Sequence, residues 1–159
     1  MKQSEVTQKY DISKSEMSEL ERALDGFFSA LRSSVYKSIP TLDELRKLEQ
    51  TYSEKLKYEA DTAAAEKAHS QKKQLHRFVT SPKRVEKPST YDLDRALKQL
   101  SEARRAENEL AYLCRAHGFD TAEVVRDFIP TARYSETLAD AYRAYVHCKS
   151  RPLFRDVRN

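Results

Sequence analysis

Apolar residues recur at helical spacing along most of the chain, beginning near residue 15. The first run has a period of three to four residues and comprises Met17, Leu20, Leu24, Phe27, Phe28, Leu31 and Val35. Ser13 and Glu16 precede it with the spacing of a capping box, in which each caps the other's backbone N–H. Pro40 follows Ile39, and a residue before proline avoids the α conformation. The pattern predicts a first helix over residues 15–38.

A second predicted helix follows at once and folds back on the first. Thr41 and Glu44 form another capping-box pair, and no Gly or Pro interrupts residues 42–79. At 1.5 Å per residue, a helix over 42–79 is about 57 Å long. The apolar positions of its first half are Leu45, Leu48, Tyr52 and Leu56; those of its second half are mostly alanine, namely Ala60, Ala63, Ala64 and Ala68.

Three more helices are predicted after a basic loop at residues 80–89, which holds two prolines and no apolar period. The third helix covers 90–117, capped by Ser89 or Thr90 and closed by Gly118 in a Schellman motif, with Phe119 folding back over it. Shorter helices are predicted at 121–129, before Pro130, and at 135–149. Residues 1–14 are polar and aperiodic and are predicted to be a flexible arm, and residues 150–159 a basic mobile tail.

The alanines of the second helix predict its partner. An antiparallel hairpin about a loop centred near residue 85 places Ala64 opposite Ala106, and likewise Ala60 opposite Leu110 and Leu56 opposite Cys114. Facing small residues let two helices approach more closely than the usual roughly 8–10 Å. We therefore predict an all-α fold: an elongated bundle of about five helices, in which residues 42–79 and 90–117 form a coiled-coil-like hairpin and the short C-terminal helices pack at its base.

Composition supports this fold and excludes others. The chain has 159 residues with two glycines and five prolines, whereas a β-sheet fold needs many Gly, Asn and Asp turns. No apolar run approaches the roughly 20 residues of a membrane-spanning helix, and no signal-peptide pattern begins the chain. Only Cys114 and Cys148 are present, which favours a reducing compartment. We expect one cytoplasmic domain, or a nuclear one in a eukaryote, without membrane contact.

Positive charge is concentrated in two segments. Residues 72–87 hold six Lys or Arg against Glu86 alone, and residues 149–159 hold four against Asp156, although the net charge is only +4. Clustered positive charge attracts polyanions, although many such runs are only solvated surface. The predicted hairpin tip gathers a candidate binding set of basic residues with two apolar neighbours: Lys72, Lys73, Arg77, Lys83, Arg84, Lys87, Leu75 and Phe78.

Candidate catalytic or metal-binding residues are few. The chain has no glycine-rich phosphate loop, nucleophile elbow or H-E-x-x-H motif. Glu66 and His69 have the spacing of a di-iron helix pair, but the second Glu-x-x-His is missing. The pairs Cys114/His117 and His147/Cys148 resemble zinc ligands, although adjacent residues supply at most one good ligand. We expect no enzyme activity, cofactor or metal, and no small-molecule substrate.

Residues 113–124 have the outline of a helix-turn-helix, but the second helix begins with acidic residues that would face DNA phosphates. Two functional hypotheses remain. The first is a non-enzymatic helical interaction or assembly module, self-associating or part of a larger complex, because Leu75, Phe78 and Leu97 lack enough internal partners. The alternative is sequence-nonspecific nucleic-acid binding through residues 72–87 and the C-terminal tail, with the weak helix-turn-helix-like element at 111–129.

Overall fold

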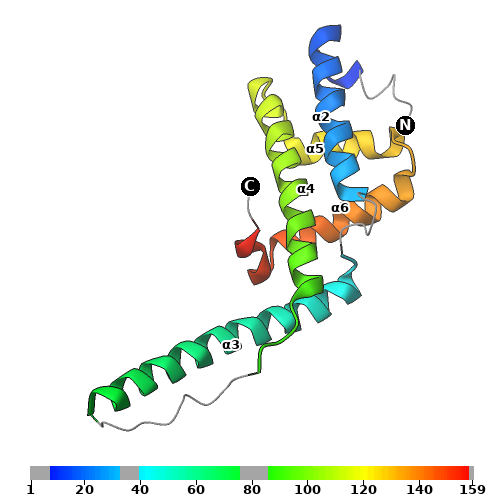
Figure 1. Ribbon diagram of the computed structural model, residues 1–159. Coiled ribbons are helices and arrows are strands. Elements are labelled where there is room, and N and C mark those ends of the chain that lie inside the picture. Colours follow the sequence, from blue (N-terminus) through cyan, green and yellow to red (C-terminus); the bar gives the residue numbers. More distant parts are fainter. Residues whose placement is uncertain (1–7, 33–39, 76–85, 158–159) are drawn as a thin grey trace.

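The computed structural model describes residues 8–32, 40–75 and 86–157, apart from the side chains of Leu42 and of residues 72–75. Its elements are the helices α2 (Lys14–Arg32), α3 (Leu42–Leu75), α4 (Tyr91–Ala116), α5 (Thr121–Phe128) and α6 (Ser135–Lys149), with 3₁₀ turns η1 (Ile129–Thr131) and η2 (Pro152–Asp156) (Figure 1). These ranges contain no strand, which confirms the all-α prediction. The predicted extensions of the first two helices to residues 38 and 79 lie outside the described residues.

Two helix starts and one helix end show the predicted local contacts, whereas Thr90, at the start of α4, makes no side-chain capping hydrogen bond. The backbone N–H of Glu16 donates to Ser13 Oγ at 3.2 Å, and that of Glu44 donates to Thr41 Oγ1 at 3.3 Å. Gly118 has a φ of +73°, and the Phe119 N–H donates to the Cys114 carbonyl at 2.8 Å, as in a Schellman motif. Both capping residues and the glycine stop were readable from the sequence.

The molecule has a head built on the antiparallel pair α2 and α4, which run side by side (Figure 1). Helix α6 packs against α2, and α5 packs against α4. The centre of the head is apolar and holds rings such as Phe27 and Tyr145, whose centroids lie 5.7 Å apart in an edge-on arrangement. Leu97 is also buried in this core, so the prediction that it lacks internal partners is wrong.

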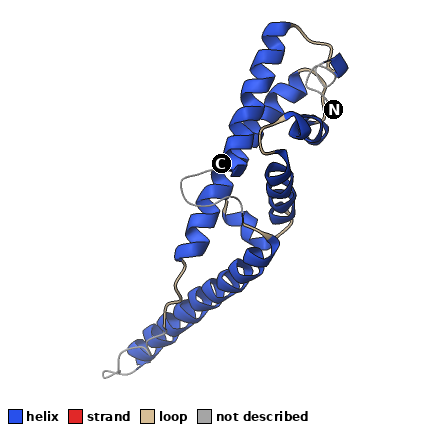
Figure 2. Cartoon of the chain, turned by 90° about the vertical axis from the view of Figure 1, so that its right-hand side faces the viewer, coloured by secondary structure: helices blue, strands red, loops and turns tan. Residues whose placement is uncertain are grey.

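Helix α3 leaves the head instead of pairing along α4. Its first turns pack against the head through Leu45, Leu48 and Tyr52, which are buried. Beyond them the helix projects away from the body, as both views show (Figures 1 and 2). No residue from Ser53 to Gln71 is buried. We call residues 53–75 of α3 the arm.

The predicted alanine-lined hairpin is therefore wrong. Ala60 and Ala64 are exposed, while their predicted partners Leu110 and Ala106 face α2 and the head core. The reason is the apolar area available: the Leu and Phe stripe of α2 buries more surface against α4 than a row of alanines does, at about 25 cal/mol per Å². Likewise α2 packs mainly on α4 and α6, and does not fold back on α3 as predicted.

Both chain ends are partly built into the head, which corrects two further predictions. Tyr10 is buried, with its ring 4.9 Å from that of Phe119 and 5.9 Å from that of Phe128. Leu153 and Val157 are buried as well. The flexible arm predicted for residues 1–14 and the mobile tail predicted for 150–159 are thus packed segments at these positions. Among the described residues, no helix is both long enough and apolar enough to cross a membrane.

Candidate interaction surfaces

The arm has two different sides. One carries half-buried residues at helical spacing, namely Tyr58, Thr62, Ala65 and His69. Tyr58 also lines a hollow with residues 86–89, where the chain returns along the arm. The opposite side is exposed and carries Leu56, Ala60, Ala63, Ala64 and Ala68, which we call the arm alanine face. Leu56 is 45% exposed.

Carboxylates border the arm alanine face on both sides. By helical spacing, Asp61 lies along one edge and Glu59 and Glu66 lie along the other. Within the described residues, none of these three carboxylates forms an ion pair. Lys67 lies within the face itself, and Lys57 lies beside Asp61 at one edge. The arm thus presents a small-residue surface with one negative edge, one edge of mixed charge and a positive charge near its middle.

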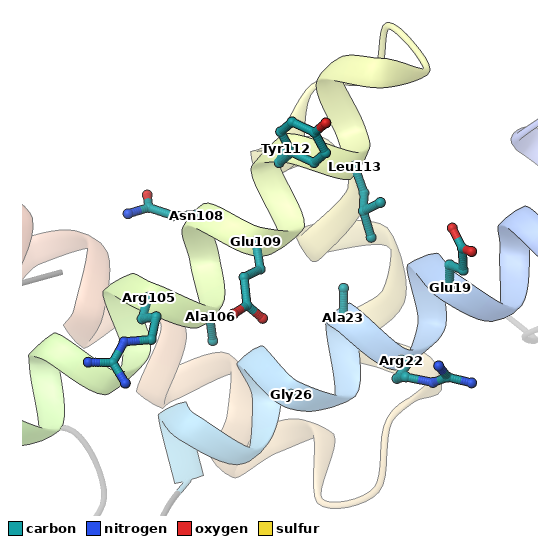
Figure 3. Close-up of a pocket in the computed structure, with 10 residues that line it drawn as sticks. All are labelled: Glu19, Arg22, Ala23, Gly26, Arg105, Ala106, Asn108, Glu109, Tyr112 and Leu113. Carbon is teal, nitrogen blue, oxygen red and sulfur yellow. The ribbon is translucent and has the colours of Figure 1, made fainter.

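A groove of about 750 Å³ lies between α2 and α4 (Figure 3). Ala23 and Ala106 point into the space between the two helices, and Gly26 lies beside them on α2. Charged and polar residues flank these small ones: Glu19 and Arg22 from α2, and Arg105, Asn108, Glu109 and Tyr112 from α4. Tyr112 is 71% exposed. The groove therefore has small residues and Leu113 along its floor, Glu109 extending across its middle, and polar residues along its rims.

Gly26 keeps this groove open. A Cβ at this position would meet no atom within 4 Å, and its φ is not in the left-handed region. Neither backbone conformation nor packing within the described chain thus requires a glycine here. In the middle of a helix, glycine costs about 1 kcal/mol relative to alanine. Within the described residues, no contact compensates for this loss of helix stability.

A basic hollow of about 540 Å³ lies near the C-terminus, lined by Arg104, Lys149, Ser150, Arg151, Pro152, Phe154 and Arg155. Two of its cations are neutralised: Lys149 Nζ lies 2.8 Å from Glu107 Oε1, and Arg151 Nε lies 3.2 Å from Glu49 Oε1. The guanidinium carbon of Arg104 lies 5.2 Å from the centre of the Phe154 ring. The sequence predicts the cluster of charges in the tail. Arg104 is distant from the tail in sequence, and only the fold places it in the same hollow.

The candidate binding set at the predicted hairpin tip is only partly described. Lys72, Lys73 and Leu75 are in the last turn of α3, and their side chains lie outside the description. Arg77, Phe78, Lys83 and Arg84 lie outside the described residues altogether. Lys87 is exposed and lines the hollow between the arm and the returning chain.

The cysteines are buried thiols. Burial raises the pKa of Cys114 and raises the pKa of Cys148 to about 11, so both remain protonated near neutral pH. His117, the other zinc candidate near Cys114, has Nδ1 at 3.4 Å from Glu16 Oε2 and stacks on Phe119. Among the described residues, no group of three His, Cys, Asp or Glu is arranged to hold a metal ion.

The acidic residues of the helix-turn-helix-like element bind another segment of the same chain. Lys9 Nζ lies 2.6 Å from Glu123 Oε1 and 2.8 Å from Asp127 Oδ2. The Tyr10 hydroxyl also donates to Asp127. These hydrogen bonds lower the pKa of Asp127 and raise that of Lys9. Helix α5 therefore holds the N-terminal segment through the acidic side chains that oppose a role in DNA reading.

Comparisons of the chain with protein-family models, with curated proteins and with solved structures found no match.

Proposed function

We propose that the chain is a non-enzymatic helical assembly module that self-associates through its arm. The observation that carries this proposal is the arm alanine face, which is exposed along its whole length. A helix gains most of its stability in a protein by packing one face against another element. The arm lacks such packing on this face within the described chain, and a second protein surface would supply it. Small side chains favour close helix–helix contact as the mode of binding.

The test is the mass of the full chain in solution as a function of concentration, measured by sedimentation velocity or light scattering. We expect the mass to rise above the 18.5 kDa of one chain as concentration increases. The variant Leu56→Glu/Ala64→Glu places charge on the arm alanine face and should keep the chain monomeric. Val146→Glu is the matched control, because Val146 on α6 is 47% exposed, nearly the same as Leu56.

Circular dichroism checks that each variant keeps its helix content. A wild-type chain that stays monomeric at every concentration would contradict self-association. If Val146→Glu weakens association as much as the arm variant does, the arm is not the surface through which the chain self-associates.

A second function, nucleic-acid binding, is supported by the basic hollow. Arg155 has no carboxylate partner among the described residues, and Arg104 is bonded only to the Val157 carbonyl, at 3.5 Å, besides its contact with Phe154. Two guanidinium groups without a carboxylate partner among the described residues, both lining one hollow, suit phosphate groups.

For this function we expect affinity for a labelled oligonucleotide to fall steeply with salt, because counterions are released on binding. Arg104→Ala/Arg155→Ala should weaken binding equally for all sequences. Arg143→Ala, which removes an exposed arginine already paired with Asp140, is the control. Affinity that is independent of salt, or equal in both variants, would refute this function.

A further inference from the structure

We propose that the groove between α2 and α4 receives the arm alanine face of a second copy of this chain. The inference depends on the proposed self-association and identifies the surface that the arm binds. Docking of an amphipathic helix into a groove between two helices is a common mode of protein recognition.

The groove is long enough for the four alanines of the arm alanine face. The groove is lined by residues 19–26 of α2 and 105–113 of α4, each about 12 Å of helix at 1.5 Å per residue. The stretch from Ala60 to Ala68 on the arm has the same length. Small residues lie at the centre of both surfaces, with Ala23, Gly26 and Ala106 in the groove, so the docked helix can lie close to the α2 and α4 backbones there.

Gly26 is explained by this contact. Its missing side chain is not needed by the conformation or packing of the described chain. A helix lying in the groove would pass over this position, where any Cβ would hold it further away. A mid-helix glycine permits another helix to come close, and no helix does so within the described residues. The docked arm is the helix that would come close to Gly26.

The charges are complementary. Arg22 and Arg105 lie on opposite rims of the groove, and neither forms an ion pair with a described residue. One edge of the arm alanine face carries Glu59 and Glu66 and can meet Arg105. The other edge carries Asp61 together with Lys57, a mixed pair that matches the mixed α2 rim. Exposed pairs of this kind add little affinity, but they select the partner and its orientation.

The middle of the groove carries the opposite sign. Glu109 extends from α4 toward α2 in the close-up view (Figure 3). Lys67, inside the arm alanine face, supplies a positive charge for it. The negative middle of the groove thus faces the positive middle of the arm alanine face. The α4 rim is positive through Arg105, whereas Glu19 beside Arg22 gives the α2 rim both charges.

The arm that fills a groove comes from another molecule. Helix α3 leaves the head near the start of α4 and points away from it, whereas the groove lies along the second half of α4 (Figures 1 and 2). A straight helix cannot turn back to this groove. Each copy thus offers one arm and one groove, and the contact joins two different surfaces.

The experiment is a complementation test with two defective full-length variants. The arm variant is Leu56→Glu/Ala64→Glu, and the groove variant is Gly26→Leu. The groove variant should fold normally, because a Cβ at this position meets open space and leucine is a better helix former than glycine. Alone, each variant should associate at least tenfold more weakly than the wild type. Mixed in equal amounts, they should form a 1:1 complex of twice the 18.5 kDa chain mass, because one intact arm meets one intact groove.

Three results would overturn the inference. A groove variant that associates as strongly as the wild type would show that arms bind one another or another surface, while self-association itself stands. A mixture that stays monomeric would show that arm and groove are not partners. A monomeric wild type would remove the proposed function together with this inference.

Discussion

The helical glycine of α2 allows a quantitative test of the monomer structure. Gly26→Ala adds a methyl group that would touch no atom within 4 Å, so only the backbone preference changes. We expect the free energy of unfolding to increase by about 1 kcal/mol. For a chain of this size, that gain raises Tm by about 2–4 °C.

The same substitution at the other glycine should have the opposite sign. Gly118 has a φ of +73°, and a Cβ there also meets open space, so the effect is again one of backbone preference. An L-residue in this conformation costs about 1–2 kcal/mol. We expect Gly118→Ala to lower Tm by an amount similar to the rise caused by Gly26→Ala.

Urea denaturation of both variants, at a concentration where the chain is monomeric, measures the two effects. The midpoints should move in opposite directions, with unchanged dependence on denaturant concentration. A loss of stability in Gly26→Ala would refute the reasoning, because it would mean that the α2 backbone is not helical at this point or that the groove is filled within the monomer.

Two further predictions concern the chain ends and the buried thiols. Tyr10→Phe keeps the ring and removes the hydrogen bond to Asp127, so it should lower stability by about 1.5 kcal/mol and speed amide hydrogen exchange in residues 8–12. The hydrogen bonds from Lys9 and then Tyr10 lower the pKa of Asp127, so their contribution is present above the ordinary pKa of 3.8 and is lost as the pH falls through the lower folded value. The variant lacks the Tyr10 part and should lose less stability in acid than the wild type. Burial raises the pKa of Cys148 from 9.0 to about 11, so the unfolded chain releases this proton first and stability should fall between pH 9 and 11. Thermal denaturation across that range should show a shallower fall in Cys148→Ala, and an unchanged pH dependence would contradict the assignment.

The helices themselves were readable from the sequence because their signals are local. Ser13, Thr41 and Gly118 act within a few residues of their own positions, and the structure places a helix end at each. Helix partners were not readable in the same way. The spacing of apolar residues indicates which side of a helix is apolar. The apolar side of α4 could pack against either α2 or α3. The alanine-to-alanine match favoured α3, but burial of large side chains favours α2.

The chain ends and the groove show a second kind of feature that the sequence pattern did not predict. Tyr10 and Leu153 are single apolar residues in polar segments, so no periodic pattern marks them, yet both are buried in the head. Arg22 and Arg105 line one groove only because α2 and α4 pair. Gly26 was the one local signal of the groove, as a glycine inside an otherwise strong helical pattern.

The pairing of α2 with α4 also has a consequence for chain connectivity. The two helices are antiparallel neighbours that a short turn could join, but residues 33–90 separate them along the chain. Closing so long a connection costs about 2 kcal/mol more entropy than closing a short turn. The head is therefore a discontinuous unit, made of an N-terminal and a C-terminal part with α3 inserted between them. During synthesis, α2 emerges well before its partner, and the core can be completed only when the C-terminal part of the chain has been made.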